Sequence, residues 1–329
     1  MVKTVGFSAL AGVVLLLGIH QMAPGALETT AKAQGGSSKA ANQVPVYEWD
    51  PTWPKQPFPN NWVVGAVVGV SVDAKEHIWV VHRPRGSVSG TQGECCLPAP
   101  AVIEFDQAGN VLQAWGGPSA EDYAASGGRG APPRIPTNLP WTPPANYDWP
   151  ASEHNIFVDY KDNVWLGNNA GYHIVKFTRQ GKFLLQIGRP GVKGQGSSDT
   201  GALMGPTGIT VDPKTNEVYV ADGYGNRRVI VFDADSGAYK RHWGAYGKKP
   251  DDTVPVQEVE YKPGAPAPQQ FDTVHCVLID KDDVVWVCDR ANSRIQVFKK
   301  DGTFVREGWI APPQEGIMPR LNAFTVTST

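Results

Sequence analysis

Residues 271–309 read FDTVHCVLIDKDDVVWVCDRANSRIQVFKKDGTFVREGW, and this stretch decides the fold. Two apolar runs flank a turn at residues 281–283, and two further β-rich runs follow across a polar loop and a Lys-Asp-Gly turn. Short β-branched or alternating runs joined by turn residues are typical of strands rather than helices. The stretch therefore predicts four short strands in sequence.

The same pattern occurs three more times upstream. Each unit has a first strand that ends at an aspartate, then a turn, then a second strand centred on an aromatic residue; the aspartates are Asp73, Asp159, Asp212 and Asp280, and three of the aromatic residues are Trp79, Trp165 and Trp286. Internal repetition of four-stranded units is the signature of a β-propeller. We predict an all-β propeller with four readable blades over residues 61–310, in which the tryptophans pack between blades and the aspartates cap turns.

The N-terminus resembles an export signal. Lys3 precedes an apolar core at residues 5–19, and Ala31-Lys32-Ala33 offers a cleavage site. This predicts a signal peptide over residues 1–33 and a secreted or periplasmic protein. An uncleaved anchor is the alternative, but the apolar core is shorter than a membrane span requires, so we expect no stable membrane insertion.

The regions outside the repeats divide into linkers and loops. Residues 34–60 are expected to form a linker, with a candidate closing strand at residues 46–49, and residues 311–329 a short irregular tail. Long loops rich in Gly, Pro and Ser, such as residues 117–152, separate the blades. Long insertions on a regular scaffold often build a binding face, so a protein partner on this loop-rich face is one expectation.

The charge balance argues against one class of partner. The chain has 30 basic and 32 acidic residues, a net charge of −2 and no long run of one sign. A nucleic-acid-binding surface needs a basic patch, so we expect no nucleic-acid partner.

The chain has four cysteines. Cys276 and Cys288 stand symmetrically about the turn at residue 282, so they can face each other across a hairpin. A disulfide and a pair of buried free thiols both remain open for them. Cys95 and Cys96 are adjacent in a loop, where only a vicinal bridge can join them.

The repeats resemble a known family through a polar motif that precedes the third strand. In the last unit it reads Asp289-Arg-Ala-Asn292-Ser-Arg294, and in the third unit Asp222, Asn226 and Arg228 stand in the same order. These units resemble NHL repeats, and we interpret the recurring Asp and Arg residues as structural. NHL proteins are usually six-bladed propellers, so the resemblance implies that the last blades are missing from this sequence.

Within that class, the chain is similar to the peptidyl-α-hydroxyglycine α-amidating lyases. The motifs Val80-Val81-His82-Arg83 and Asp222-Gly223-Tyr224 match that family, as do His154 and His275. The resemblance implies that His154 and His275 bind zinc, with Tyr224 and Arg83 beside it. It also implies a structural calcium ion held partly by the main-chain carbonyls of Val70 and Ile156. The family's third zinc histidine belongs to a later blade.

The repeat alignment supports part of this reading independently. His154 and His275 both stand five residues before the anchor aspartate, where the other two blades have Val68 and Thr207. Inner strands surround the central channel, so equivalent positions converge there, and neutral imidazoles suit Zn²⁺, Cu²⁺ or Ni²⁺. Two ligands alone make a weak site; the alternative is a pair of channel histidines bonded to water. His82 is a candidate substitute ligand.

Near a metal, the Tyr224 phenol can act as a base, and the planar charge of Arg83 or Arg290 can clamp a carboxylate. The alternatives are a surface loop tyrosine and arginines that pair with loop acids. Two functions follow. The first is a zinc-dependent carbon–nitrogen lyase that cleaves peptidyl-α-hydroxyglycine, a small or peptide ligand in the channel, to peptide amide and glyoxylate. The second is a non-catalytic propeller that binds a peptide, a glycan or a protein outside the cytoplasm.

Overall fold

The computed structural model describes residues 48–88, 92–118, 146–255 and 266–310. The predicted signal peptide, residues 34–47 of the linker, most of the 117–152 loop and the tail lie outside these ranges. Half of the predicted closing strand also lies outside them, and the other half, residues 48–49, is not in a strand.

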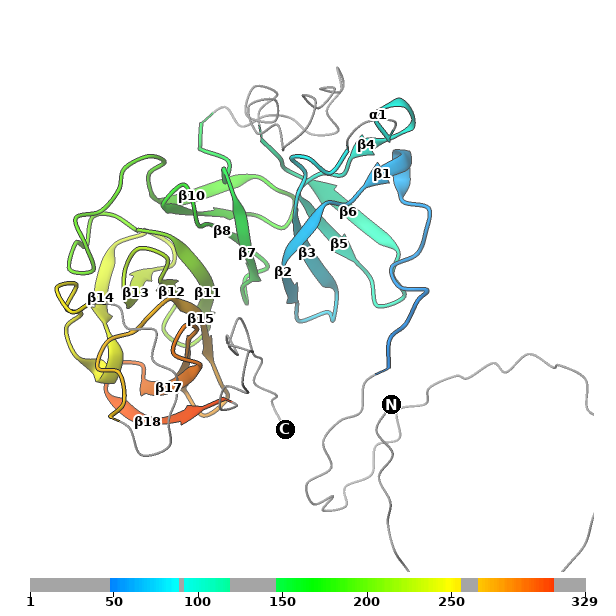
Figure 1. Ribbon diagram of the computed structural model, residues 1–329. Helices are drawn as coiled ribbons and strands as arrows, with labels where there is room; N and C mark the ends of the chain where they lie inside the picture. Colours follow the sequence, from blue (N-terminus) through cyan, green and yellow to red (C-terminus); the bar gives the residue numbers. More distant parts are fainter. Residues whose placement is uncertain (1–47, 89–91, 119–145, 256–265, 311–329) are drawn as a thin grey trace, which may run out of the picture. The chain divides into compact units, whose positions relative to one another are not determined.

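The described residues contain four antiparallel sheets of four strands, one for each predicted repeat, with the strands paired in chain order (Figure 1). The strands are β2 (Ala66–Val72), β3 (Ile78–Arg83), β5 (Val102–Phe105) and β6 (Val111–Trp115); β7 (Glu153–Val158), β8 (Val164–Asn168), β9 (His173–Phe177) and β10 (Phe183–Gly188); β11 (Pro206–Asp212), β12 (Glu217–Asp222), β13 (Arg228–Asp233) and β14 (Tyr239–Trp243); and β15 (Val274–Ile279), β16 (Val284–Asp289), β17 (Arg294–Lys299) and β18 (Phe304–Trp309). The prediction of an all-β protein built from propeller blades is confirmed.

The anchor aspartates hold the first turn of each blade. Asp73 Oδ1 accepts hydrogen bonds from the backbone N–H groups of Lys75, at 2.8 Å, and His77, at 2.9 Å. Its other oxygen accepts the indole N–H of Trp79 at 3.1 Å. Trp165 and Trp286 make the same bond to their own anchor aspartates. A short side chain that accepts from the backbone two and four residues on stabilises a turn, which explains the spacing between the aspartate and the aromatic residue.

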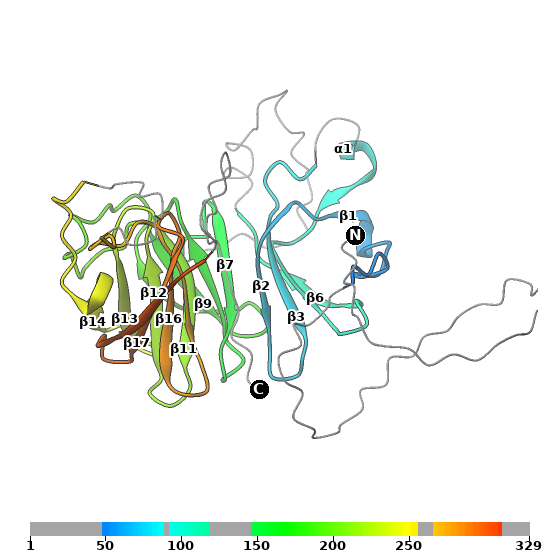
Figure 2. The ribbon, with the colours of Figure 1, turned by 60° about the horizontal axis from the view of Figure 1, so that its bottom comes forward.

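The core lies between successive blades. The first strands of neighbouring blades are in contact, β2 with β7, β7 with β11 and β11 with β15 (Figure 2). Fully buried side chains from each pair of adjacent sheets pack together, as Trp79 does against Val164 and Leu166. The predicted packing role holds for Trp79 and Trp165, which are fully buried, whereas Trp286 is partly exposed beneath the Arg306 guanidinium. Each blade thus buries its apolar surface on its neighbours.

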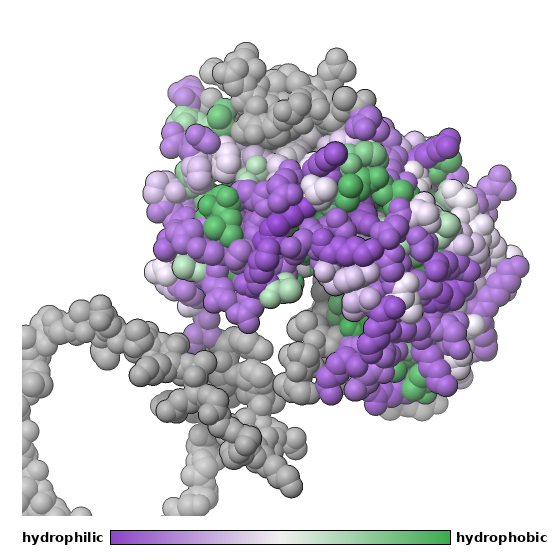
Figure 3. Space-filling view, turned by 180° about the vertical axis from the view of Figure 1, so that it is seen from behind, coloured by the Kyte–Doolittle hydropathy of each residue, from purple (hydrophilic) through white to green (hydrophobic). Residues whose placement is uncertain are grey.

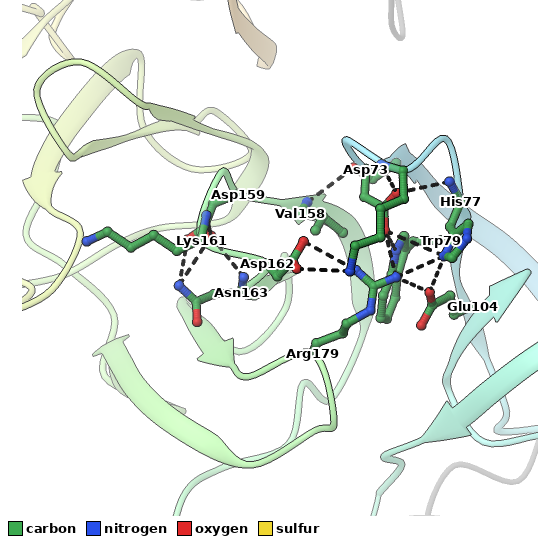
Figure 4. A network of polar contacts seen from close by, with 12 residues as sticks. Asp73, His77, Trp79, Glu104, Val158, Asp159, Lys161, Asp162, Asn163 and Arg179 are labelled. Atoms are coloured by element: carbon green, nitrogen blue, oxygen red, sulfur yellow. Dashed lines mark hydrogen bonds and ion pairs between the residues drawn. The ribbon is translucent and has the colours of Figure 1, made fainter.

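A polar network also joins the first two blades (Figure 4). The Arg179 guanidinium lies 2.8 Å from Asp73 and 3.2 Å from Asp162, contacts Glu104, and stacks 5.1 Å from the Trp79 ring. Asp73, His77 and Glu104 have the spacing of metal ligands. Because the guanidinium already contacts all three, we assign this cluster to blade–blade stability rather than to a metal.

Several short elements were not predicted from the sequence. The 3-10 helix η1 (Pro59–Asn61) precedes β1 (Trp62–Val63), which pairs in parallel with β4 (Leu97–Pro98). The single-turn α1 (Gln92–Cys95) lies in the loop between β3 and β5, and η2 (Ala245–Gly247) follows β14. None of these has a hydrophobic period long enough to be recognised.

Both cysteine pairs form disulfides. Cys276 and Cys288 are register partners of β15 and β16, with their Cα atoms 4.9 Å apart, so the cross-strand bridge is confirmed over the free thiols. Cys95 and Cys96 form the vicinal bridge.

Within the part of the chain that the structure describes, no helix has the length and hydrophobicity that a membrane span requires. On the face shown in Figure 3, hydrophilic side chains predominate and hydrophobic ones form separate small patches.

Candidate functional site

The first strand of every blade carries a β-bulge at the same repeat position. The pairing register shifts between Glu153 and Asn155 in β7, and between Val274 and Cys276 in β15. The skipped residues are His154 and His275; in the other two blades they are Val68 and Thr207. A bulge frees a residue from the ladder and redirects its side chain. Two of the four bulges therefore present a histidine.

These histidines converge with a tyrosine. The Nε2 atoms of His154 and His275 lie 3.2 Å apart. The Tyr224 hydroxyl lies 3.2 Å from His275 Nε2 and 3.5 Å from His154 Nε2. Both imidazoles are partly buried, and the Tyr224 side chain is 43% exposed. The structure thus brings together three of the residues that the sequence singled out, from three different blades.

Burial and the local charges keep His154 neutral. Burial, followed by the charges of His275, Arg83 and Arg290, lowers the pKa of the His154 imidazole to about 4. A neutral imidazole retains the lone pair that a metal ion needs. In addition, His154 Nδ1 is buried and has no hydrogen-bond partner among the described residues.

The donor atoms fit a transition-metal ion. Two nitrogen ligands of one tetrahedral zinc ion stand roughly 3.3 Å apart, given bonds of about 2.0–2.1 Å. The observed Nε2 separation is 3.2 Å, and the phenol oxygen lies at similar distances from both nitrogens. Among the described residues, no other histidine, cysteine or carboxylate completes a three-ligand group with His154 and His275. The one three-ligand group found in this part of the chain is the cluster of Asp73, His77 and Glu104.

Tyr224 is fixed by a close approach of two loops. Its backbone N–H donates to the Gly205 carbonyl at 3.2 Å. Gly205 has a φ of +102°, and a Cβ atom there would lie 2.6 Å from Tyr224 Cβ, so this position requires glycine. On the other side, Arg290 Nη1 donates to the Tyr224 hydroxyl at 3.3 Å. The backbone and the hydroxyl of Tyr224 are thus both held by neighbouring loops.

Arg83 reaches the site from the first blade. Its Nε donates to the backbone carbonyl of Glu153 at 3.0 Å, the residue before His154. Its partner is therefore a main-chain carbonyl rather than a loop acid. Arg83 and Arg290 together make the surroundings of the two histidines positive, which suits an anionic ligand.

His82 is not a substitute ligand, and that hypothesis is wrong. The ring is fully buried within the first blade. Its Nδ1 accepts the Gly65 N–H at 3.1 Å, and its Nε2 donates to the Pro100 carbonyl at 2.9 Å. Both nitrogens are thus engaged. Burial lowers the pKa of His82 to about 4, which keeps this arrangement neutral.

Val70 and Ile156, the residues expected to offer carbonyls to calcium, lie on adjacent inner strands. Val70 pairs with Val80 in β2, and Ile156 pairs with Leu166 in β7. The two main chains approach closely, since a Cβ atom on Gly69 would lie 2.9 Å from the Ile156 nitrogen. Calcium binding here stays a prediction.

The recurring Asp and Arg residues, interpreted from the sequence as structural, form buried ion pairs. The pairs Asp222–Arg228 and Asp289–Arg294 are fully buried, at 3.0 Å and 2.7 Å. They anchor the loops that follow β12 and β16, the loops that carry Tyr224 and Arg290.

One residue of the site region was missed from the sequence. Glu153 is 1% exposed, it directly precedes His154, and its backbone carbonyl accepts the Arg83 Nε–H. The signal was present in the alignment, because the equivalent residues of the other blades are Val67, Pro206 and Val274.

The NHL repeat family model matches residues 203–232 and 271–298, which cover the third and fourth blades. The chain is 34% identical over 158 residues to the peptidylglycine alpha-amidating monooxygenase of Rattus norvegicus, which covers 47% of this chain and 14% of that protein. It is 27% identical over 268 residues to the peptidyl-alpha-hydroxyglycine alpha-amidating lyase 1 of Drosophila melanogaster, covering 78% of this chain and 41% of that protein.

The match thus spans less than half of either relative's length. Among solved structures, a streptogramin B lyase matches at a TM-score of 0.42 and 14% identity, over 75% of this chain and 55% of that one. The chain thus carries NHL repeats in its third and fourth blades and is similar to the peptidyl-α-hydroxyglycine α-amidating lyases.

Proposed function

We propose that this chain binds zinc through His154 and His275 and cleaves the carbon–nitrogen bond of peptidyl-α-hydroxyglycine, releasing a peptide amide and glyoxylate. The observation that carries the proposal is the convergence of His154, His275 and Tyr224 within 3.5 Å. When bound, zinc would supply Lewis acidity toward the substrate hydroxyl.

Arg83 would hold the substrate. Its guanidinium is permanently charged and planar, and it can bind a carboxylate through two parallel hydrogen bonds. The Nε–H is occupied by the Glu153 carbonyl, and the structure shows no hydrogen bond for the terminal nitrogens among the described residues. The terminal carboxylate of a hydroxyglycine residue matches this group.

Tyr224 would accept the hydroxyl proton. Its phenol oxygen lies against both histidine nitrogens and accepts a hydrogen bond from Arg290, and a positioned phenol can serve as a general base. As the C–OH proton leaves to Tyr224, the carbinol carbon becomes the aldehyde carbon of glyoxylate and the C–N bond breaks. The amide nitrogen then takes up a proton, so atoms and charge balance.

The test is glyoxylate release from N-benzoyl-α-hydroxyglycine by the zinc-loaded chain. We expect benzamide and glyoxylate in equal amounts, at a rate above that without protein. The matched control is the double variant H154Q/H275Q, which keeps Tyr224, Arg83 and Arg290. A zinc-loaded chain that releases no glyoxylate above the uncatalysed rate contradicts the proposal.

The second candidate function is a non-catalytic binding propeller. The observation that favours it is that only two histidines converge within the described residues, whereas a catalytic zinc site normally has three protein ligands. In that case the zinc-loaded chain binds N-benzoylglycine through the arginines without turning over the hydroxylated substrate.

A further inference from the structure

Glu153 breaks the repeat rule at a place where the fold does not need a charge. The other three blades carry apolar residues there, Val67, Pro206 and Val274. Each position pairs with the last part of the second strand just before the bulge, as Glu153 does with Asn168. A carboxylate that is 1% exposed is costly to bury unless its interactions repay the lost hydration.

Glu153 contacts Trp149 and two arginines of the first blade. Its Oε1 accepts the Trp149 indole N–H at 2.7 Å and lies 3.5 Å from Arg85 Nη1. Its backbone carbonyl accepts Arg83 Nε–H at 3.0 Å. Arg83 and Arg85 flank a single proline, so both ends of one turn after β3 are fastened to one residue of β7.

The second carboxylate oxygen of Glu153 is not satisfied by a hydrogen bond from the described residues. Glu153 Oε2 is buried and has no hydrogen-bond partner among the described residues. Burial raises the pKa of Glu153, while the charges of Arg85 and Arg83 act in the opposite direction. The carboxylate thus contacts Arg85, and the backbone carbonyl of the same residue holds Arg83, while one carboxylate oxygen stays unsatisfied.

We propose that Glu153 is a positioning residue. Its buried carboxylate holds Arg85, which fixes the turn after β3 against the start of β7 and so keeps Arg83 on the Glu153 backbone carbonyl, with its guanidinium beside His154. The inference rests on the proposed function for its consequence, namely that Arg83 binds the substrate carboxylate. It does not rest on zinc. A mobile arginine binds a carboxylate less well, because ordering its long side chain opposes binding.

The informative variants are E153Q and E153V. The first keeps the shape and the Trp149 hydrogen bond but removes the charge. The second installs the residue of the first and fourth blades. E217Q is the matched control, because Glu217 is also a buried carboxylate paired with an arginine, Arg241 at 2.6 Å, but at the opposite end of β12 from Tyr224.

Two readouts are needed in the full chain. The first is hydrogen exchange of the Arg83 Nε–H by NMR in the metal-free protein. We expect E153Q and E153V to speed it about 10-fold or more, comparable to the loss of other supporting groups around a site, with no change in E217Q. The second is the KM for N-benzoyl-α-hydroxyglycine, which we expect to rise about 10-fold in E153Q with a smaller change in kcat.

Stability separates positioning from a structural role. When the Glu153 carboxylate is removed, Arg85 still has hydrogen bonds to the backbone carbonyls of Pro150, at 3.2 Å, and Ala151, at 2.8 Å. E153V should therefore be as stable as the parent or more stable. Unchanged Arg83 exchange in both variants overturns the inference, as does a loss of stability without faster exchange. A parent chain that lacks lyase activity contradicts the proposed function, and the exchange measurement still decides the role of Glu153.

Discussion

His154 Nε2 and His275 Nε2 lie 3.2 Å apart although 121 residues separate them in the chain. The convergence follows from repetition. Each histidine occupies the bulge of a first strand, and the first strands of neighbouring blades are in contact. Isolated histidines rarely meet by chance, whereas equivalent positions in a repeat architecture are brought together by the fold itself.

Tyr224 should be needed for catalysis but not for metal binding. Y224F should lower kcat about 100-fold or more, because a positioned acid–base group contributes on that scale. Steady-state glyoxylate release measures this. The control is Y239F, since Tyr239 is equally exposed, at 41% against 43%, and also contacts a histidine, His242, but lies in the outer strand of its blade. Equal activity of Y224F and the parent contradicts the assigned role.

The pH dependence of stability should carry a signature of His154. Its pKa is about 4 in the folded protein and near 6.5 in a free chain, so between these values the unfolded state binds more protons. Stability of the metal-free protein should therefore fall as pH drops from about 6.5 to 4, by on the order of 2 kcal/mol from this group.

H154Q should flatten that fall. The comparison with the parent is essential, because burial raises the pKa of Asp289 to about 6 and this carboxyl contributes with the opposite sign in the same window. Urea unfolding at several pH values in the presence of a chelator provides the measurement. Parallel curves for the two proteins would show that His154 is not held neutral.

The buried pair Asp289–Arg294 should dominate the stability of the fourth blade. R294M leaves the fully buried Asp289 carboxylate without its cation, so we expect a loss of about 3 kcal/mol or more in the free energy of unfolding. R306M is the control, because Arg306 stacks on Trp286 at the surface of the same blade. Similar losses in both variants would contradict the structural role of the pair.

The fold was predictable because the turn after the first strand of each blade has a recognisable sequence. The anchor aspartate accepts hydrogen bonds from backbone N–H groups and from an indole N–H within seven residues, so each blade can be recognised from a short local pattern. The β1–β4 pair and α1 were not predictable, because two-residue strands and a single helical turn have no period.

The candidate site was predictable where it follows the repeat and not where it departs from it. His154, His275 and Tyr224 converge as expected. His82 was misjudged because it occupies the repeat position of Asp222 and Asp289. Like those aspartates, it accepts a backbone N–H from the loop before the first strand of its blade, so its ring is held inside the blade. The alignment shows Glu153 as the one charged residue at its repeat position, but only the structure shows that its carboxylate is buried.

The most direct test is the zinc content and affinity of the purified chain and of H154Q/H275Q, measured by elemental analysis and by competition with a chromogenic chelator. H242N serves as the control, since His242 contacts a tyrosine but lies in an outer strand. We expect one zinc ion per parent chain and per H242N chain, and an affinity for zinc that is at least about 100-fold weaker in H154Q/H275Q. Zinc bound equally by all three proteins, or by none, would contradict it.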